Sequence, residues 1–232
     1  MPLKALVESA PVYAWDMEEA DRSKSFKCPH CPDDLILVLP THSIIKHFRH
    51  KNNEAHGEPE TPEHLAGKQF IVNCLKNVGF DAEPEVRIDG HICDVLAKVK
   101  HREIPVEFQC SPIATDEYAD RINTYGDESR WLLGTHFFNH ATTFKVVEKK
   151  YRDGDFTGIG VSDFYKKTYY IQRILKVEEM MQRQQPLFYL SNTHSLYLAR
   201  WKYRLRSTVL GWYNLRNVQP SVFVEFVRGA PF

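Results

Sequence analysis

The chain has 232 residues, of which 43% are hydrophobic and 12% aromatic, which is enough apolar material for one full domain and a smaller appended module. Lys and Arg together number 30, as do Asp and Glu, so the formal net charge is zero at pH 7. The absence of any apolar run of ~20 residues, of a signal peptide and of paired cysteines beyond Cys28 and Cys31 argues against a membrane-spanning or disulfide-rich secreted protein.

The two signs of charge are unevenly distributed along the chain. Residues 1–161 hold 19 Lys and Arg against 26 Asp and Glu, whereas residues 162–232 hold 11 against 4. An acidic part can hold cations and a basic part attracts phosphate. This combination is typical of metal-dependent proteins that act on nucleic acid. Two oppositely charged lobes that attract each other would give the same counts. We expect a cytoplasmic protein with no membrane partner.

The N-terminal segment carries a pattern of metal ligands. Alternating residues predict a hairpin over 3–15 and a strand over 35–39. The candidate ligands on either side of that strand are Cys28, Cys31, His47 and His50. Two residues between the cysteines let one turn aim both thiolates at one ion, and two histidines complete a tetrahedral shell, so the spacing predicts structural Zn²⁺. His30 and His42 are alternatives for one ligand, and the competing explanation, a surface turn with incidental histidines, has to account for four ligand types at this spacing.

A module boundary and a helix follow the metal-ligand pattern. The polar stretch 51–61 is typical of a linker. Thr61 is a suitable N-cap, Pro62 suits the first helical position, and Gly79 provides the stop. The helix carries Glu63 in its first turn, where a carboxylate is favoured by the helix dipole whether or not it has a catalytic role.

The next elements predicted are strands at 81–88, 92–99 and 104–110, in an antiparallel meander. A second helix is predicted at 115–125 and a buried strand at 130–134. The order helix, three strands, helix, strand predicts a mixed α/β domain with α+β character.

Two carboxylates lie within the apolar central strands. Asp94 and Glu107 cost free energy there unless they are paired or hold a cation. On adjacent antiparallel strands they could share one ion, and oxygen ligands of this kind suit Mg²⁺ or Mn²⁺. Such an ion would activate water for hydrolysis of a phosphodiester. Strand alternation that simply places each acid towards solvent is the competing explanation.

At these positions the chain resembles the CoiA-like competence proteins. The matching motifs are Cys28-Pro-His-Cys31, His47-Phe-Arg-His50, Glu63-His64 with Lys68, Asp94-Val95, Val106 to Ser111, Arg121 and Tyr125. The resemblance covers about residues 1–135 and implies a restriction-endonuclease-like core of the PD-(D/E)XK type, preceded by a zinc module.

The resemblance also implies roles for individual residues. Asp94 and Glu107 become the metal-binding acids, and Gln109 occupies the place where the wider superfamily carries a catalytic lysine. Glutamine is common there among CoiA-like proteins, but a neutral amide supplies no positive charge to the transition state. Lys68 could supply that charge or be a solvated helix residue, and Glu63 could be a further ligand or hold a metal-bound water.

The candidate nucleic-acid contacts lie on the second helix and in the basic C-terminal part. They are Ser111, Arg121, Tyr125, Arg200, Lys202, Arg204 and Arg206. Arg121 and Tyr125 share one helix face, and the four C-terminal cations would line one face of a strand and follow phosphates. A covered sheet edge and an ordinary solvated strand face are the alternatives. A further helix is predicted at 162–185.

These features predict three parts: an N-terminal zinc-binding module (1–58), a restriction-endonuclease-like nuclease core (59–160) and a basic C-terminal region (161–232). The predicted function is that of a Mg²⁺- or Mn²⁺-dependent deoxyribonuclease in competence, recombination or defence. A catalytically silent DNA-binding accessory protein is the alternative, and an interaction module of a recombination or defence assembly is a third. The expected partner is DNA, with strandedness and oligomeric state open.

Overall fold

The computed structural model describes residues 2–42, 44–52, 60–111, 113–134, 168–173, 187–190, 196–204 and 210–229. The chain forms two compact units, Met1–Lys98 and Val99–Phe232. Within the described ranges no helix is long and apolar enough to span a membrane. The predicted module boundaries at 58/59 and 160/161 lie outside the described residues and stay predictions.

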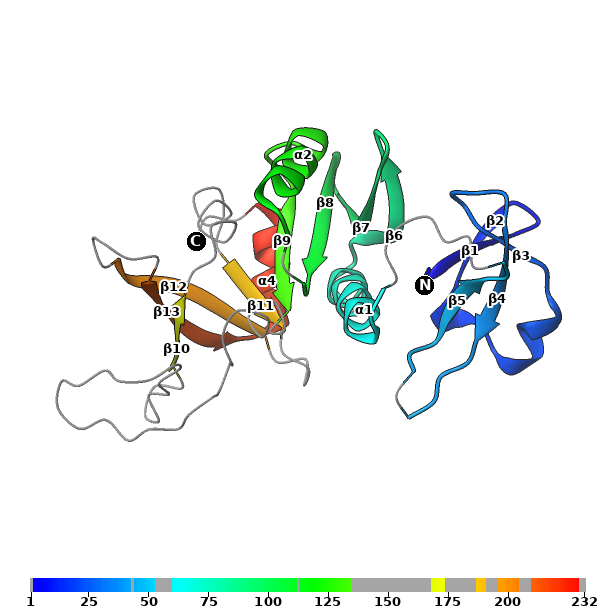
Figure 1. Cartoon of the computed structure of the whole chain (residues 1–232), viewed down its shortest axis with the longest axis horizontal. Helices are drawn as coiled ribbons and strands as arrows, with labels where there is room; N and C mark the ends of the chain where they lie inside the picture. The colour runs from blue at the N-terminus through cyan, green and yellow to red at the C-terminus, as the bar shows by residue number, and fades with distance from the viewer. Residues whose placement is uncertain are drawn as a thin grey trace. The chain divides into compact units, whose positions relative to one another are not determined.

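The first unit begins with a five-stranded antiparallel sheet in the order β2-β1-β3-β4-β5 (Figure 1). The strands are β1 (Lys4–Val7), β2 (Ala10–Tyr13), β3 (Phe26–Lys27), β4 (Asp34–Val38) and β5 (His47–His50), with short 3-10 helices η1 (Ala14–Asp16) and η2 (Glu19–Ser23) between β2 and β3. The predicted hairpin is confirmed as β1 and β2. Phe26 and Phe48, with ring centroids 4.9 Å apart, lie in the core of this sheet.

The same unit continues with α1 (Pro62–Lys76), β6 (Asp81–Ile88) and most of β7 (His91–Val99). The predicted N-cap is confirmed, because the Thr61 hydroxyl accepts a hydrogen bond from the backbone N–H of His64 at 3.2 Å. β6 and β7 pair antiparallel across the Asp89-Gly90 turn, where both residues have positive φ, as a tight two-residue hairpin turn requires. α1 buries Leu65, Ile71 and Leu75. These elements bring the first turn of α1 and the middle of β7 into one compact unit.

The second unit contains a sheet in the order β8-β9-β11-β12-β13-β10. Its elements are β8 (Arg102–Gln109), α2 (Thr115–Tyr125), β9 (Arg130–Gly134), β10 (Thr168–Arg173), β11 (Leu187–Leu190), β12 (Leu196–Arg204), β13 (Leu210–Val218) and α4 (Pro220–Arg228). β9 pairs parallel with β8 and β11, and the other pairs are antiparallel. This mixture confirms the predicted α/β class with a mixed sheet, and it is consistent with a restriction-endonuclease-like core.

Aromatic contacts attach helices to this sheet. The ring of Tyr118 on α2 meets Trp131 on β9 edge-on at 5.0 Å. Phe226 on α4 stacks on Phe188 of β11 at 4.9 Å, and Phe223 meets Phe188 edge-on at 5.6 Å. All five side chains are buried, so α2 and α4 each contribute to the core of the second unit.

The C-terminal part differs from the prediction. The predicted helix at 162–185 is wrong over residues 168–173, which form β10 and pair antiparallel with β13. Thr168, Tyr169, Tyr170 and Ile171 are β-branched or aromatic, and pairing along β13 outweighs the charge pattern that suggested a helix. α4 was not predicted, although Pro220 stands in its first turn and Gly229 has the left-handed conformation typical of a helix end.

Candidate functional site

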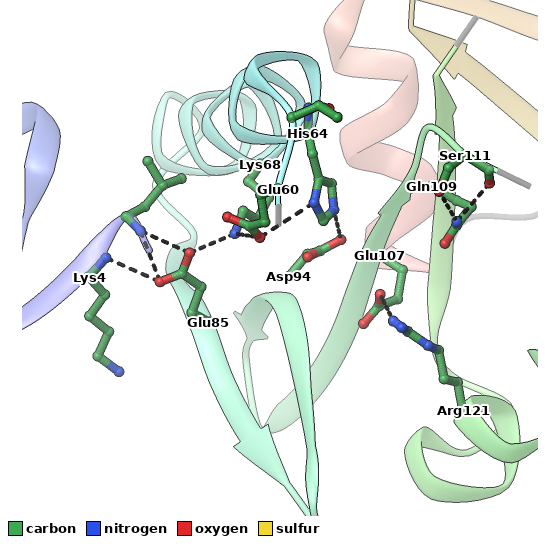
Figure 2. Close-up of polar contacts among 12 residues, drawn as sticks. Lys4, Glu60, His64, Lys68, Glu85, Asp94, Glu107, Gln109, Ser111 and Arg121 are labelled. Carbon is green, nitrogen blue, oxygen red and sulfur yellow. Dashed lines mark hydrogen bonds and ion pairs between the residues drawn. The ribbon is translucent and has the colours of Figure 1, made fainter. Parts of the chain in front are cut away.

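The first turn of α1 and the middle of β7 bring together three metal-ligating side chains. Glu60 lies just before the N-cap, His64 lies one turn along, and Asp94 projects from β7 (Figure 2). His64 Nε2 is 3.0 Å from Asp94 Oδ2, and His64 Nδ1 is 3.4 Å from Glu60 Oε1. One ligand atom from each residue lies within 4.8 Å of the others. We call these three residues the acidic-histidine cluster.

In the acidic-histidine cluster, burial and neighbouring charges shift the pKa values of Glu60 and His64 in opposite directions, and the charges have the larger effect. Burial by itself would lower the pKa of His64, but the Asp94 carboxylate and the hydrogen bonds to Asp94 and Glu60 raise it well above its usual value. Burial would raise the pKa of Glu60, but the Lys68 ammonium and His64 hold it at about 2. The Glu60 carboxylate is therefore ionised at neutral pH. Two carboxylates and an imidazole suit a divalent cation such as Mn²⁺, and two carboxylates also suit Mg²⁺.

Lys68 lies one turn further along α1, and it is buried with an exposed fraction of 1%. Its ammonium donates to Glu60 Oε1 at 2.5 Å and to Glu85 Oε1 at 2.6 Å. Burial would lower the pKa of Lys68, but the carboxylates of Glu85 and Glu60 raise it. The lysine predicted to be catalytic is thus a buried cation between two carboxylates.

The structure selects Glu60 rather than Glu63 for the acidic-histidine cluster. Glu63 is a first-turn acid of α1 and is half-buried, but it is not a member of either metal-ligating group found among the described residues. The predicted role of Glu63 as a further ligand stays a prediction. Glu60 was missed because the sequence shows no periodic signal before a helix N-cap.

In the second unit, Glu107 is held by an arginine. Its side chain is buried on β8, and Oε2 accepts from Nη1 of Arg121 at 2.9 Å. Arg121 also donates to Glu117 Oε1 at 3.0 Å, so it joins two acids of the same unit. Asp94 and Glu107 belong to different compact units, and their sharing of one ion stays a prediction.

The other predicted residues of this unit lie at the end of β8 and on α2. Gln109 Nε2 donates to the carbonyl of Ser111 at 2.8 Å and contacts its hydroxyl at 3.3 Å (Figure 2). Tyr125, on the same helix as Arg121, is buried with an exposed fraction of 7%. Contacts of Ser111, Arg121 and Tyr125 with nucleic acid stay predictions.

A second metal-ligating group lies in the N-terminal sheet. Cys28, Cys31 and His50 form it, with Cys31 Sγ 3.5 Å from His50 Nε2. Burial raises the pKa of the Cys28 thiol to about 11. Two sulfurs and one imidazole are ligands that Zn²⁺ prefers. We call these three residues the cysteine-histidine group.

His47, the fourth predicted zinc ligand, is not a member of this group. His47 and His50 lie three residues apart on strand β5, and residues at odd separations in a strand point to opposite faces. The ring of His47 contacts the carbonyl of Ile45 through Nδ1 at 2.7 Å, and burial lowers its pKa. His30, an alternative ligand, instead contacts the carbonyl of Glu85 through Nε2 at 3.0 Å.

The basic C-terminal residues fall partly outside the described residues. Arg200, Lys202 and Arg204 lie on β12, as the predicted strand requires, but Arg206 lies outside the described ranges. The pairing of β12 with β13 shifts register between Trp201 and Tyr203, so the regular two-residue alternation that the prediction assumed is interrupted there. Binding of phosphates by these residues stays a prediction.

Comparison with known proteins finds relatives for the part of the chain that contains α1 to β9. Residues 60–154 match the family model described as "Competence protein CoiA, nuclease-like domain". The chain is 31% identical over 121 residues to the "Competence protein CoiA" of Bacillus subtilis (strain 168), which covers 49% of this chain and 32% of that relative. The match thus spans about a third of the relative's length. No solved structure matches the chain.

Proposed function

We propose that the chain is a divalent-metal-dependent nuclease that hydrolyses phosphodiester bonds in DNA, because residues 60–154 match the CoiA nuclease-like domain. The acidic-histidine cluster carries this proposal. Glu60, His64 and Asp94 gather two carboxylates and an imidazole in a partly buried position, where a bound cation would offset the charge of the carboxylates.

The residues of the acidic-histidine cluster have different roles in binding the ion. Asp94 and Glu60 offer carboxylate oxygens, and His64 orients Asp94 through the 3.0 Å contact between Nε2 and Oδ2. When bound, Mg²⁺ or Mn²⁺ supplies an activated water and offsets charge on the scissile phosphate. The resemblance to PD-(D/E)XK nucleases adds Glu107 as a further metal-binding acid. DNA is the proposed partner, with competence, recombination or defence as the setting.

We propose further that the cysteine-histidine group binds structural Zn²⁺. Cys28 and Cys31 supply thiolates and His50 supplies an imidazole, donors that Zn²⁺ prefers, and a fourth ligand would complete the tetrahedral shell of a structural site. Oxygen-preferring Mg²⁺ and Mn²⁺ would select the other cluster, so the two metal-ligating groups take different ions.

The proposal is tested by cleavage of labelled linear, circular and single-stranded DNA with and without Mn²⁺. We expect Mn²⁺-dependent cutting by the wild type and a loss of about 100-fold or more in Asp94→Asn, because the neutral amide removes the charge that holds the ion. The matched control is Asp89→Asn in the exposed turn between β6 and β7, which should cut like the wild type. An Asp94→Asn protein that folds and cuts normally would refute the assignment.

A catalytically silent DNA-binding protein is the second candidate. Gln109 favours it, because its amide is engaged with Ser111 and carries no positive charge towards a phosphate. DNA binding by the wild type without cutting in Mg²⁺ or Mn²⁺ would support this alternative over the nuclease.

A further inference from the structure

Glu85 on β6 connects the N-terminal sheet to α1. Its backbone has a φ of 55°, in the left-handed region that a glutamate rarely adopts. Its carboxylate accepts hydrogen bonds from the backbone N–H groups of Leu3 at 2.9 and 3.0 Å and of Lys4 at 3.2 Å. The same carboxylate accepts from Lys68 at 2.6 Å, and the Glu85 carbonyl contacts His30 at 3.0 Å. One buried residue therefore binds β1 and a helix at once.

Lys68 carries the connection from Glu85 to the acidic-histidine cluster. Its ammonium lies between Glu85 and Glu60, and Glu60 in turn contacts His64 (Figure 2). With 1% exposure and two carboxylates at hydrogen-bond distance, the ammonium would have to leave both acids to reach a phosphate. Separating Lys68 from Glu60 would leave a buried charge without one of its partners, which costs free energy. Lys68 therefore fixes the position of Glu60.

We propose that Glu85 and Lys68 are positioning residues, which hold Glu60 in the acidic-histidine cluster. The affinity of this cluster for its cation then depends on the hydrogen bonds between the start of β1 and Glu85. The path runs from the β1 backbone through Glu85 and Lys68 to Glu60. This inference rests on the proposed function, because it assigns these residues to the metal site of that function. It gives Lys68 a supporting role in place of the predicted catalytic one.

The test compares Glu85→Gln with Asp81→Asn in the full chain. Both substitutions replace a β6 carboxylate by an amide, and Asp81 is an exposed residue at the start of β6. Mn²⁺ affinity is measured by calorimetry without DNA, and the Mn²⁺ dependence of DNA cleavage is measured in parallel. Mn²⁺ is chosen because it prefers oxygen ligands over the thiolates of the cysteine-histidine group.

We expect the Mn²⁺ dissociation constant of Glu85→Gln to rise about tenfold, as is usual when a residue supporting a ligand is lost. The cleavage rate at saturating Mn²⁺ should stay within about twofold of the wild type, because the ligands themselves are unchanged. Asp81→Asn should match the wild type in both measurements. A loss caused by misfolding alone would lower the active fraction and would not be rescued by added Mn²⁺.

Unchanged Mn²⁺ affinity in Glu85→Gln would overturn the inference, as would a lowered maximal rate at unchanged affinity. If Glu85→Gln does not fold, Glu85→Asp provides the same comparison, because it keeps the charge but shortens the reach by one methylene; unchanged affinity there would equally refute the inference. A wild type that binds Mn²⁺ without cutting DNA refutes the proposed function alone, and one that binds no Mn²⁺ refutes both.

Discussion

The chemistry of each histidine in the first unit follows from what surrounds its ring. Two carboxylates beside His64 raise its pKa despite burial, whereas burial without a nearby acid of comparable effect lowers the pKa of His47. His50 lies beside the sulfur of Cys31. Three histidines with the same intrinsic chemistry therefore have three different environments, which spacing along the chain does not reveal.

The environment of His47 predicts a measurable titration. In the zinc-loaded protein we expect the His47 ring to titrate below its ordinary pKa of 6.5, as followed by NMR. The unfolded chain then binds a proton more readily, so His47 lowers the stability of the fold as the pH falls below 6.5. The sequence-based assignment of His47 as a zinc ligand predicts instead that the ring does not titrate until the metal dissociates, and that result would support the assignment.

At the scale of elements, the start of α1 determines the geometry of the acidic-histidine cluster. Thr61 caps the helix, because its hydroxyl accepts a hydrogen bond from the backbone N–H of His64. Glu60 immediately precedes this cap. The cap and two of the metal-ligating residues thus occupy a single helical turn. Local structure and site geometry depend on the same hydrogen bond.

We expect Thr61→Ala to lower the free energy of unfolding by about 1 kcal/mol, because it removes the side-chain cap of α1. Thr61→Ser keeps the hydroxyl and should change the free energy of unfolding by less than about 0.5 kcal/mol. Urea denaturation of the full chain measures both variants. Equal stability of Thr61→Ala and the wild type would show that the cap does not contribute to the fold.

At the scale of the molecule, the N-terminal sheet and the α1–β7 segment form one compact unit. The backbone N–H groups of Leu3 and of Lys4, the first residue of β1, donate to Glu85, and the ammonium of Lys4 contacts Glu83 at 2.6 Å. Lys76 at the end of α1 also lies 5.2 Å from the ring of Tyr13 and 5.8 Å from that of Trp15. The stability of the N-terminal sheet is therefore expected to affect the whole unit.

Removal of zinc should consequently destabilise more than the cysteine-histidine group. We expect chelation, or Cys31→Ser, to lower the thermal midpoint by about 5 °C or more, equivalent to about 2 kcal/mol. Cys110→Ser is the matched control, because Cys110 is half-buried in the second unit and is not a member of either metal-ligating group. A midpoint insensitive to chelators would argue against structural zinc.

Much of the local structure could be predicted from the sequence because it depends on neighbouring residues. The hairpin over 3–15, the Thr61 cap and helix 115–125 follow from alternation, capping and turn residues, and the structure contains them. The CoiA-like resemblance was also readable from short motifs, and the comparison of residues 60–154 confirms it.

The tertiary structure decided which side chains meet. Glu60 joins Asp94 across 34 positions of the chain, and Glu85 reaches the backbone of Leu3 across 82, contacts that no local pattern records. β10 formed where a helix was expected, because its β-branched and aromatic residues pair with β13, which outweighs the charge pattern that suggested a helix. The sequence determines the elements and the chemical groups available, whereas long-range packing decides which of those groups share a site, since burial and charge act through space and not along the chain.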